Sequence, residues 1–92
     1  MIVDLDVHEP EGFARYREGV PALAKKHGGE YLVRGADFDV IEGDWRSHRL
    51  VIFHFPDRAA IRALFADPDY DELKALRHRV ADSVIIAVDG VD

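Results

Sequence analysis

The fold is decided by one stretch of sequence, Arg49-Leu50-Val51-Ile52-Phe53-His54-Phe55-Pro56-Asp57. Its β-branched and aromatic residues predict a strand that Pro56 closes, and Asp57 is a good cap for a following helix. The length and apolarity of this strand indicate a central position in a sheet, with both faces buried. His54 is the one residue that interrupts the apolar run, so it is the first candidate for a functional role.

The composition indicates one small domain over residues 1–92. Of these residues 48% are hydrophobic and 33% are charged, and the net charge is −6. A chain of this length buries only about 60–65% of the surface that its unfolded state exposes, so a partner subunit would stabilise its core. The negative charge argues against nucleic acid and against an anionic membrane as partners, since both require a basic surface.

The chain contains no cysteine. This excludes disulfides, thiolate chemistry and cysteine metal sites, and it fits a reducing compartment. The N-terminal residues lack the basic segment and the apolar run of a signal peptide, and no apolar stretch reaches the roughly 20 residues that a membrane helix needs. We therefore expect a cytoplasmic protein that does not contact a membrane.

Hydrophobic periodicity predicts six elements in the order β-α-β-β-α-β. Pro21 lies inside the first helix and predicts a kink or a break near Gly19-Val20. The second helix is expected to break at Asp67-Pro68 and to start again there, with Asp67 as its cap. The expected strands are residues 2–8, 29–34, 49–55 and 83–89, and the helices follow the first and the third of them.

Two interpretations are open for the residues after the second strand. Gly35-Ala36-Asp37 interrupts that strand, and Phe38 to Glu42 resumes the extended pattern. We prefer one long strand with a bulge or bend at the glycine, and a tight hairpin at the same point is the alternative. Residues 43–48 are expected to form the next loop, which carries the only tryptophan, Trp45.

This order of elements predicts an α+β fold of the ferredoxin-like βαββαβ type, a four-stranded antiparallel sheet with its helices on one face. Right-handed crossovers are expected to make the first and third strands parallel neighbours at the centre of the sheet. Hydrophobicity places Val3, Leu5, Val7, Val51, Phe53 and Phe55 under the helices.

The opposite face of the sheet is expected to be mixed in character. It would carry Asp4, Asp6, His8, Ile52 and His54, and Asp6 and His54 would approach each other if the two central strands are neighbours. An uncovered face that carries Ile52 and Ile85 is expected to pack against a second copy of the chain.

Several segments together resemble one protein family. These segments are Tyr16 and Pro21, Gly28-Gly29, Tyr31-Leu32-Val33-Arg34-Gly35, Glu42-Gly43-Asp44-Trp45, Val51-Ile52-Phe53-His54-Phe55-Pro56, Asp67-Pro68-Asp69-Tyr70 and Leu73-Lys74-Ala75-Leu76-Arg77. In their order and spacing, and over nearly its whole length, the chain resembles the family known as domain of unknown function 1330, a branch of the dimeric α/β-barrel proteins.

The resemblance implies a ferredoxin-like fold and a homodimer with its two sheets face to face, and it implies no established activity. More distant relatives on this fold include cofactor-free monooxygenases, haem enzymes and small-lactone isomerases, an analogy of fold only. His54 stands where the family often has glutamate, and Ala36 where it often has a second glycine. A carboxylate mechanism shared by the whole family would therefore not extend to His54.

Two sets of residues are candidates for a site. In the first, His54 would be a general base and Asp6 the carboxylate that orients it; the alternative is a histidine that fills a polar position in a dimer interface. The second set would line a ligand pocket at the edge of the sheet and consists of Arg34, Glu42, Trp45, Tyr70 and Arg77.

Within the second set, Arg34 or Arg77 would hold an anionic group and Trp45 would stack on a ring. The structural alternative pairs Arg34 with Glu42, packs Trp45 on the core and packs Tyr70 against a helix. The spacings of the five histidines match no zinc motif, so we expect no metal. We expect no other cofactor either, since Gly28-Gly29 ends a helix and precedes a strand, the reverse of a phosphate-binding loop.

These observations lead to two hypotheses of function. The first is a small cytoplasmic homodimer that binds a small organic molecule and acts as a cofactor-independent enzyme of oxidation or isomerisation. The second is a non-catalytic binding or interaction module whose polar cluster only specifies the dimer. The sequence does not decide whether the protein is an enzyme.

Overall fold

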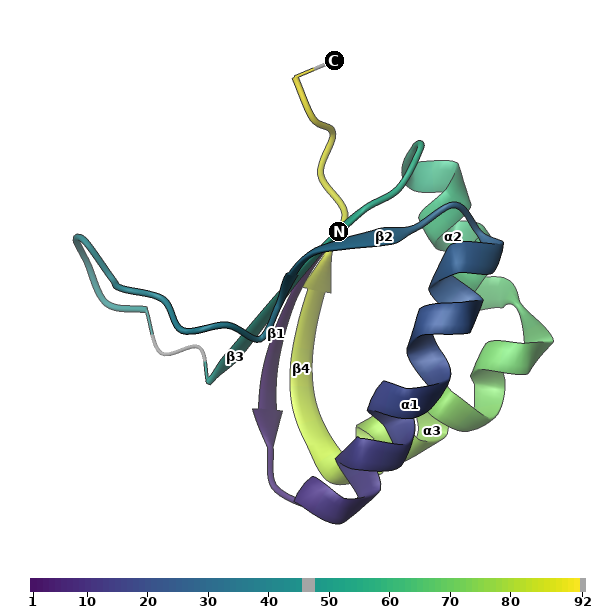
Figure 1. The fold of residues 1–92 in the computed structure, drawn as a ribbon, viewed down its shortest axis with the longest axis horizontal. Coiled ribbons are helices and arrows are strands. Elements are labelled where there is room, and N and C mark those ends of the chain that lie inside the picture. Colours follow the sequence, from purple (N-terminus) through teal and green to yellow (C-terminus); the bar gives the residue numbers. More distant parts are fainter. Residues whose placement is uncertain (46–47, 92) are drawn as a thin grey trace.

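One sheet with helices on one of its faces organises the chain (Figure 1). The structure is a computed structural model that describes residues 1–45 and 48–91. The elements are β1 (Ile2–Val7), α1 (Pro10–Lys26), β2 (Glu30–Arg34), β3 (Arg49–His54), α2 (Arg58–Ala66), the short 3-10 helix η1 (Pro68–Tyr70), α3 (Asp71–Val80) and β4 (Ala81–Ile86). The strand order β2-β3-β1-β4, with antiparallel neighbours throughout, confirms the α+β ferredoxin-like fold.

The central strands β1 and β3 do not run in the expected relative direction. β1 and β3 are neighbours, but they are antiparallel, with Val3 opposite Val51 and Leu5 opposite Arg49. The expected parallel pairing is wrong because the crossover through α1 connects β1 with β2. Those two strands are the parallel ones, and β3 lies between them, antiparallel to both.

The helix-covered face of the sheet forms the core, as hydrophobicity predicts. Less than a tenth of each core side chain is exposed, and Val7 packs at the margin. Ile85 lies opposite Val3 and so faces the helices, which corrects its expected place on the open face. The core strands contribute Val3, Leu5, Val51, Phe53 and the adjoining Phe55, and the helices contribute chiefly Phe13, Val20, Leu23, Leu64, Tyr70 and Val80.

Helix α1 packs tightly against α3. It continues through Pro21. The break, one of the two outcomes expected near Gly19-Val20, therefore does not occur. A Cβ atom at Gly12 would lie 2.5 Å from Cγ1 of Val80, and one at Gly19 would lie 2.8 Å from Cδ2 of Leu73. These two glycines therefore permit the close approach of the helices that cover the sheet.

The residues after β2 depart from both sequence interpretations. β2 ends at Arg34, and residues 36–45 form an exposed arm without a strand that extends away from the sheet (Figure 1). A bulge does occur, but it lies between Tyr31 and Val33 rather than at the glycine. β4 likewise ends at Ile86 instead of residue 89.

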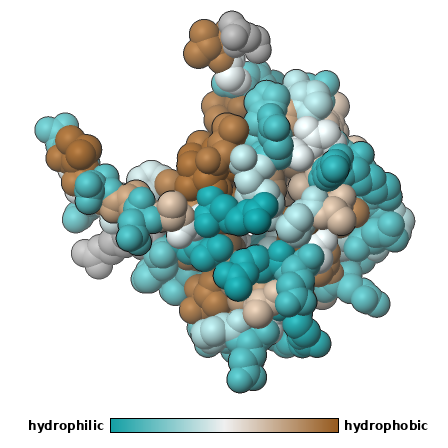
Figure 2. All heavy atoms as spheres, viewed as in Figure 1, coloured by the Kyte–Doolittle hydropathy of each residue, from teal (hydrophilic) through white to brown (hydrophobic). Residues whose placement is uncertain are grey.

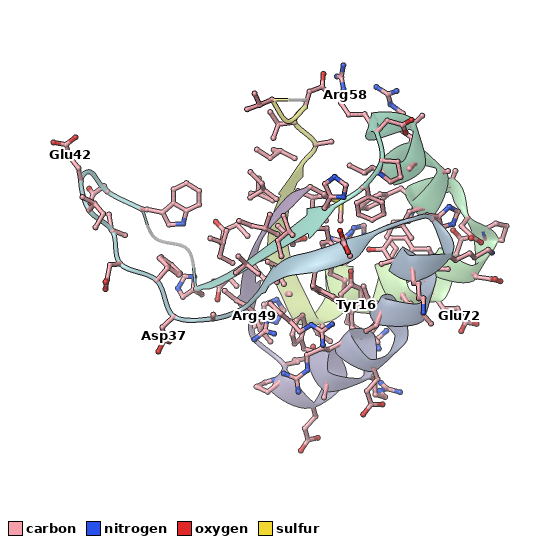
Figure 3. The ribbon with its side chains drawn as sticks, turned by 45° about the horizontal axis from the view of Figure 1, so that its top comes forward. Tyr16, Asp37, Glu42, Arg49, Arg58 and Glu72 are labelled. Carbon is pink, nitrogen blue, oxygen red and sulfur yellow. The ribbon has the colours of Figure 1, made fainter. Side chains whose placement is uncertain are left out.

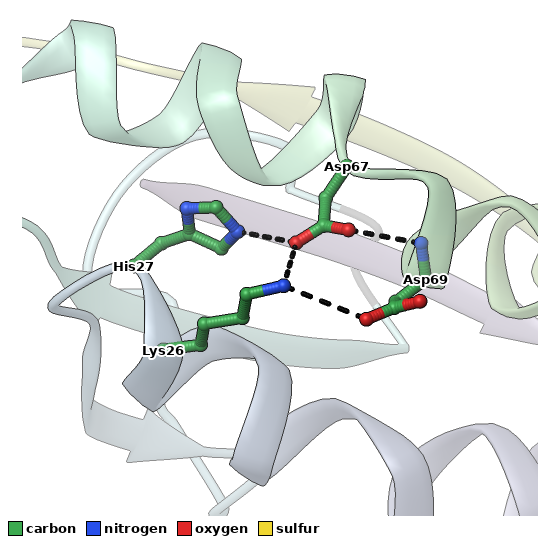
Figure 4. A network of polar contacts seen from close by, with 4 residues as sticks. All are labelled: Lys26, His27, Asp67 and Asp69. Carbon is green, nitrogen blue, oxygen red and sulfur yellow. Dashed lines mark hydrogen bonds and ion pairs between the residues drawn. The ribbon is translucent and has the colours of Figure 1, made fainter.

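A buried carboxylate joins the end of α1 to the junction between α2 and η1, where the helix breaks as predicted (Figure 4). Oδ2 of Asp67 accepts hydrogen bonds from Nζ of Lys26 and Nε2 of His27, each at 2.8 Å. Its Oδ1 accepts the backbone N–H of Asp69 at 2.9 Å. The bond from Lys26, followed by those from His27 and Asp69, holds the pKa of the Asp67 carboxyl well below its usual range.

The Asp67 network predicts a pH-dependent contribution to stability. A carboxyl whose pKa is lowered by folding stabilises the protein above its ordinary pKa of about 4, and this stabilisation is lost as the pH falls through the lower folded value. Asp67→Asn should therefore lower the free energy of unfolding most near neutral pH, and the difference from wild type should shrink in acid. Urea titrations at several pH values measure this difference.

Asp69→Asn is the matched control, because the Asp69 side chain is 76% exposed and lies 3.5 Å from Lys26. It should change stability much less than Asp67→Asn does. A gap between Asp67→Asn and wild type that stays constant from pH 7 to pH 3 would contradict the assignment.

Candidate functional site

The structure separates the two residues expected to act as base and carboxylate. Asp6 lies near His48, with 3.8 Å between Oδ1 and Nδ1. His54 lies at the other end of β3, where its Nδ1 is 3.7 Å from Oε1 of Glu30. The antiparallel register of β1 and β3 keeps Asp6 and His54 apart, so the expected approach of these two side chains within one subunit is wrong.

The expected ligand-binding set is only partly brought together. Arg34 and Tyr70 line one cavity, and Arg77 is buried near Tyr16 and bonds to Ser83. Glu42 and Trp45 lie on the arm, and Figure 3 shows Glu42 at its tip, far from Tyr16. Trp45 is 53% exposed, so the alternative in which it packs on the core is wrong as well, whereas Tyr70 does pack in the core.

The cavity lies between the sheet and the helices. Its volume is about 40 Å³, enough to hold water or a small part of a ligand. Aromatic and aliphatic side chains form most of its wall, which is the usual character of a small-molecule site. Six of them are Val3, Phe13, Val20, Val51, Phe53 and Leu64.

Tyr16 and Tyr70, two of the polar residues that line this cavity, are joined by a hydrogen bond. The hydroxyl oxygens of Tyr16 and Tyr70 are 2.8 Å apart. Burial raises the pKa of Tyr16 strongly, Tyr70 raises it further, and the nearby Arg77 guanidinium opposes the shift only in part. The Tyr16 hydroxyl is therefore a weaker acid than a free phenol, and either hydroxyl of the pair could be the donor of the hydrogen bond that they share.

Two arginines of the sheet point toward the mouth of the cavity. Because of the bulge at Leu32, Arg34 lies opposite Val51 and shares the helix-covered face with Tyr31. The Arg34 guanidinium carbon is 3.7 Å from the centre of the Tyr31 ring, a distance typical of a cation–π contact. Strict alternation along β2 would place Tyr31 and Arg34 on opposite faces, and the bulge brings them to the same face.

Arg49 occupies the other side of the mouth. Its guanidinium carbon lies 5.4 Å from the centre of the Phe13 ring, and its Nε atom is buried without a hydrogen-bond partner. A Cβ atom at Gly35 would lie 2.5 Å from the guanidinium carbon, and Gly35 has a φ of +69°. Only glycine both adopts this backbone conformation without strain and leaves room for the guanidinium.

Outside the cavity the surface forms a hollow of about 440 Å³, to which α1 adds a third arginine. The residues that line it are Arg17, Glu18, Tyr31, Arg34 and Arg49. Among residues 1–45 and 48–91, no carboxylate lies within 4.0 Å of the three guanidiniums as an ion pair. The mouth of the cavity is therefore cationic, although the chain as a whole has a net charge of −6.

Sequence reasoning missed Arg17, Arg49, Tyr16 and Tyr31 as members of this site. A signal for Arg49 was present, because alternation along the third strand places Arg49 on the same face as Val51 and Phe53. Arg17 follows Phe13 by one helical turn, and this spacing places it on the same side of α1. The sequence carries no signal for the bulge that turns Arg34 toward them.

In the part of the chain that the structure describes, no group of three or more histidine, aspartate or glutamate side chains is arranged to hold a metal ion. None of the helices described is both long and apolar enough to cross a membrane.

The comparisons with known proteins identify the family. The family model described as a domain of unknown function, DUF1330, matches residues 1–91, and the chain therefore belongs to the DUF1330 family, as its sequence motifs suggest. No curated protein matches the chain.

Two solved structures show the same fold. The crystal structure of methylated RPA0582 protein has 19% identity and a TM-score of 0.79, with 99% of this chain and 78% of that chain covered. The crystal structure of RPA0582, a protein of unknown function from Rhodopseudomonas palustris, has 21% identity and a TM-score of 0.72, with 99% and 82% covered. At these identities the likeness extends to the fold alone.

The tyrosine pair predicts a coupling that stability measurements can detect. Tyr16→Phe or Tyr70→Phe leaves the other hydroxyl without its partner, which should lower the free energy of unfolding by about 1–3 kcal/mol. The double variant should lose less than the sum of the two single losses. Tyr31→Phe, for which no side-chain hydrogen bond is described, is the control. Strictly additive single losses in a double-mutant cycle would show that the two hydroxyls do not interact.

Proposed function

We propose that this DUF1330 protein binds a small organic molecule in the cavity between its sheet and helix α1. One observation carries the proposal: a mainly apolar cavity has a tyrosine hydroxyl pair in its wall and arginines at its mouth. The cavity supplies apolar contact, and the hollow outside it adds about 440 Å³, which lies within the usual range for a ligand site. Binding, rather than catalysis at the open face of the sheet, is the function that this geometry supports.

The sequence-based hypothesis of cofactor-independent oxidation or isomerisation would require a group that transfers protons. Among the described residues that line the inner cavity there is neither a histidine nor a carboxylate. The Tyr16–Tyr70 pair would supply hydrogen bonds to a bound molecule, and the raised pKa of Tyr16 makes its hydroxyl a poor proton donor. A reaction that begins with proton abstraction by His54 and Asp6 of one subunit is not part of the proposal, since these residues lie apart.

We also propose that the protein is a homodimer and that the open face of the sheet is its interface. A row of apolar residues crosses all four strands of this face, in the order Ile86, Ile2, Ile52 and Val33. Val84 on the same face is 62% exposed, and Figure 2 shows apolar side chains gathered on the side of the sheet that faces away from the helices. Exposed apolar surface of this kind is commonly covered by a second subunit.

The second hypothesis, a non-catalytic module with a polar cluster that specifies the dimer, receives less support. Four acids and histidines of the open face lie in two separate places, Asp6 with His48 and His54 with Glu30. They do not form the single cluster that this hypothesis requires. The absence of cysteine supports a reducing compartment, and we retain the cytoplasm as the proposed location.

The proposed binding site predicts contacts that NMR can locate. A panel of small aromatic and aliphatic molecules, with neutral, anionic and cationic members, should include binders that shift the resonances of Val20, Tyr31 and Leu64. Val20→Phe should fill the cavity and weaken such binding at least tenfold, whereas Ala22→Phe on the exposed side of α1 should leave it unchanged. If no member at millimolar concentration perturbs the cavity residues, the proposal is wrong.

The proposed dimer predicts a mass twice that of the monomer in light scattering after gel filtration at micromolar concentration. Val84→Glu places a charge in the apolar open face and should shift the equilibrium to monomer by desolvation and repulsion. Ala75→Glu introduces the same charge on the exposed side of α3 and should leave the dimer intact. A wild-type protein that stays monomeric, or a Val84→Glu variant that stays dimeric, would contradict the interface.

A further inference from the structure

Three arginines for which no ion pair is described lie at the mouth of the cavity. Arg17 comes from α1, Arg34 from β2 and Arg49 from β3, and all three line both the inner cavity and the outer hollow. The planar fork of donors on a guanidinium fits a carboxylate well, so a carboxylate is a natural partner for an arginine. Here the described residues supply no such pair, and Nε of Arg49 is buried without a partner.

The arrangement of these arginines is held by contacts that do not neutralise them. Arg34 rests on the Tyr31 ring, and Arg49 lies near the Phe13 ring in the space that Gly35 leaves free. Aromatic rings position a guanidinium by its face and leave its N–H donors free at the edge. Both arginines act on Tyr31, where they oppose the rise in the pKa of its hydroxyl that burial causes. The donors thus converge on one hollow.

The balance of charge at the mouth indicates the charge of the missing partner. Glu18 lines the outer hollow, and Asp6 lines an adjoining hollow together with Arg17 and Arg49. Three guanidiniums against two carboxylates leave a single net positive charge, and the charges of Lys25 and Glu30, which line a third hollow together with Arg34, offset each other. One negative charge on a ligand would balance the net positive charge.

The wall of the cavity behind the arginines indicates the chemical character of the rest of the ligand. The inner cavity opens from the same residues and is lined mainly by aromatic and aliphatic side chains. An inorganic anion would use only the arginines and would leave this apolar surface unfilled. We infer that the ligand of this site is a small organic monoacid, with its carboxylate held by Arg17, Arg34 and Arg49 and its apolar body lying in the outer hollow, where one end of it reaches the cavity.

This inference rests on the proposed binding function and narrows it to one chemical class. It is tested with probes of the same shape and different charge, phenylacetate and phenylacetamide, by titration followed by NMR. Phenylacetate should bind at least tenfold more tightly than phenylacetamide, since bonds between a guanidinium and a carboxylate are roughly twice as strong as neutral ones. Raising the salt concentration from 50 to 500 mM should weaken the binding of phenylacetate and not that of the amide.

Substitution of the arginines provides the second part of the test. Arg17→Gln, Arg34→Gln and Arg49→Gln should each weaken phenylacetate binding by about tenfold and change phenylacetamide binding little. Arg15→Gln removes the same charge from an exposed position on α1 outside the arginine hollow and should leave both affinities within twofold. Arg34 is exposed, so Arg34→Gln keeps the test decisive if the partly buried Arg49→Gln fails to fold.

The outcomes separate this inference from the proposed function. Equal affinity for acid and amide, with shifts at the cavity residues, would overturn the acid class and leave the binding function standing. Acetate bound as tightly as phenylacetate would also overturn the inference, because the apolar body would contribute nothing. If phenyl phosphate bound more tightly than phenylacetate, the inference that the ligand carries one negative charge would be wrong. If neither phenylacetate nor phenylacetamide perturbs the cavity, both proposals fail.

Discussion

The antiparallel pairing of β1 with β3 at the centre of the sheet is the constraint on which the rest of the structure depends. It places Val3 opposite Val51 and Leu5 opposite Arg49, so the face under the helices receives the core residues together with one arginine. It also moves Asp6 to the end where His48 lies and leaves His54 at the other end. The direction of β3 relative to β1 therefore places Arg49 beside the core residues, and it separates Asp6 from His54, the expected catalytic pair.

The cavity depends on two small irregularities in this regular frame. The bulge at Leu32 shifts the alternation of β2 by one residue, which turns Arg34 to the helix-covered face. Gly35 then follows with a positive φ and without a side chain, which leaves room for the guanidinium of Arg49. Bulges and glycines of this kind often re-aim side chains near functional sites, and here they bring cations to the mouth of an apolar cavity.

The two faces of the sheet differ in what covers them. Helices cover one face and enclose the tyrosine pair, while the other presents a row of aliphatic side chains to its surroundings. The arm carries further exposed apolar residues, among them Ile41 at 92% exposure and Trp45 at 53%. A second subunit on the open face would cover apolar surface without obstructing the arginines, which lie on the side of the sheet toward the helices. The proposed dimerisation and the proposed binding are therefore compatible, because they use opposite faces of the sheet.

The sequence alone determined the elements that depend on local pattern. Alternation in Val3, Leu5, Val51 and Phe53, helical spacing in α1, and the cap and break at Asp67-Pro68 are all local signals, and the structure follows them. The family also followed from motifs along the chain. What local pattern could not give was the direction of β3 against β1, the position of the bulge and the course of the arm, because each depends on contacts between residues distant in sequence. Arg17, Arg34 and Arg49 became a site only when tertiary structure brought them together, since side chains on one helix and two strands have no fixed distance until the sheet is paired.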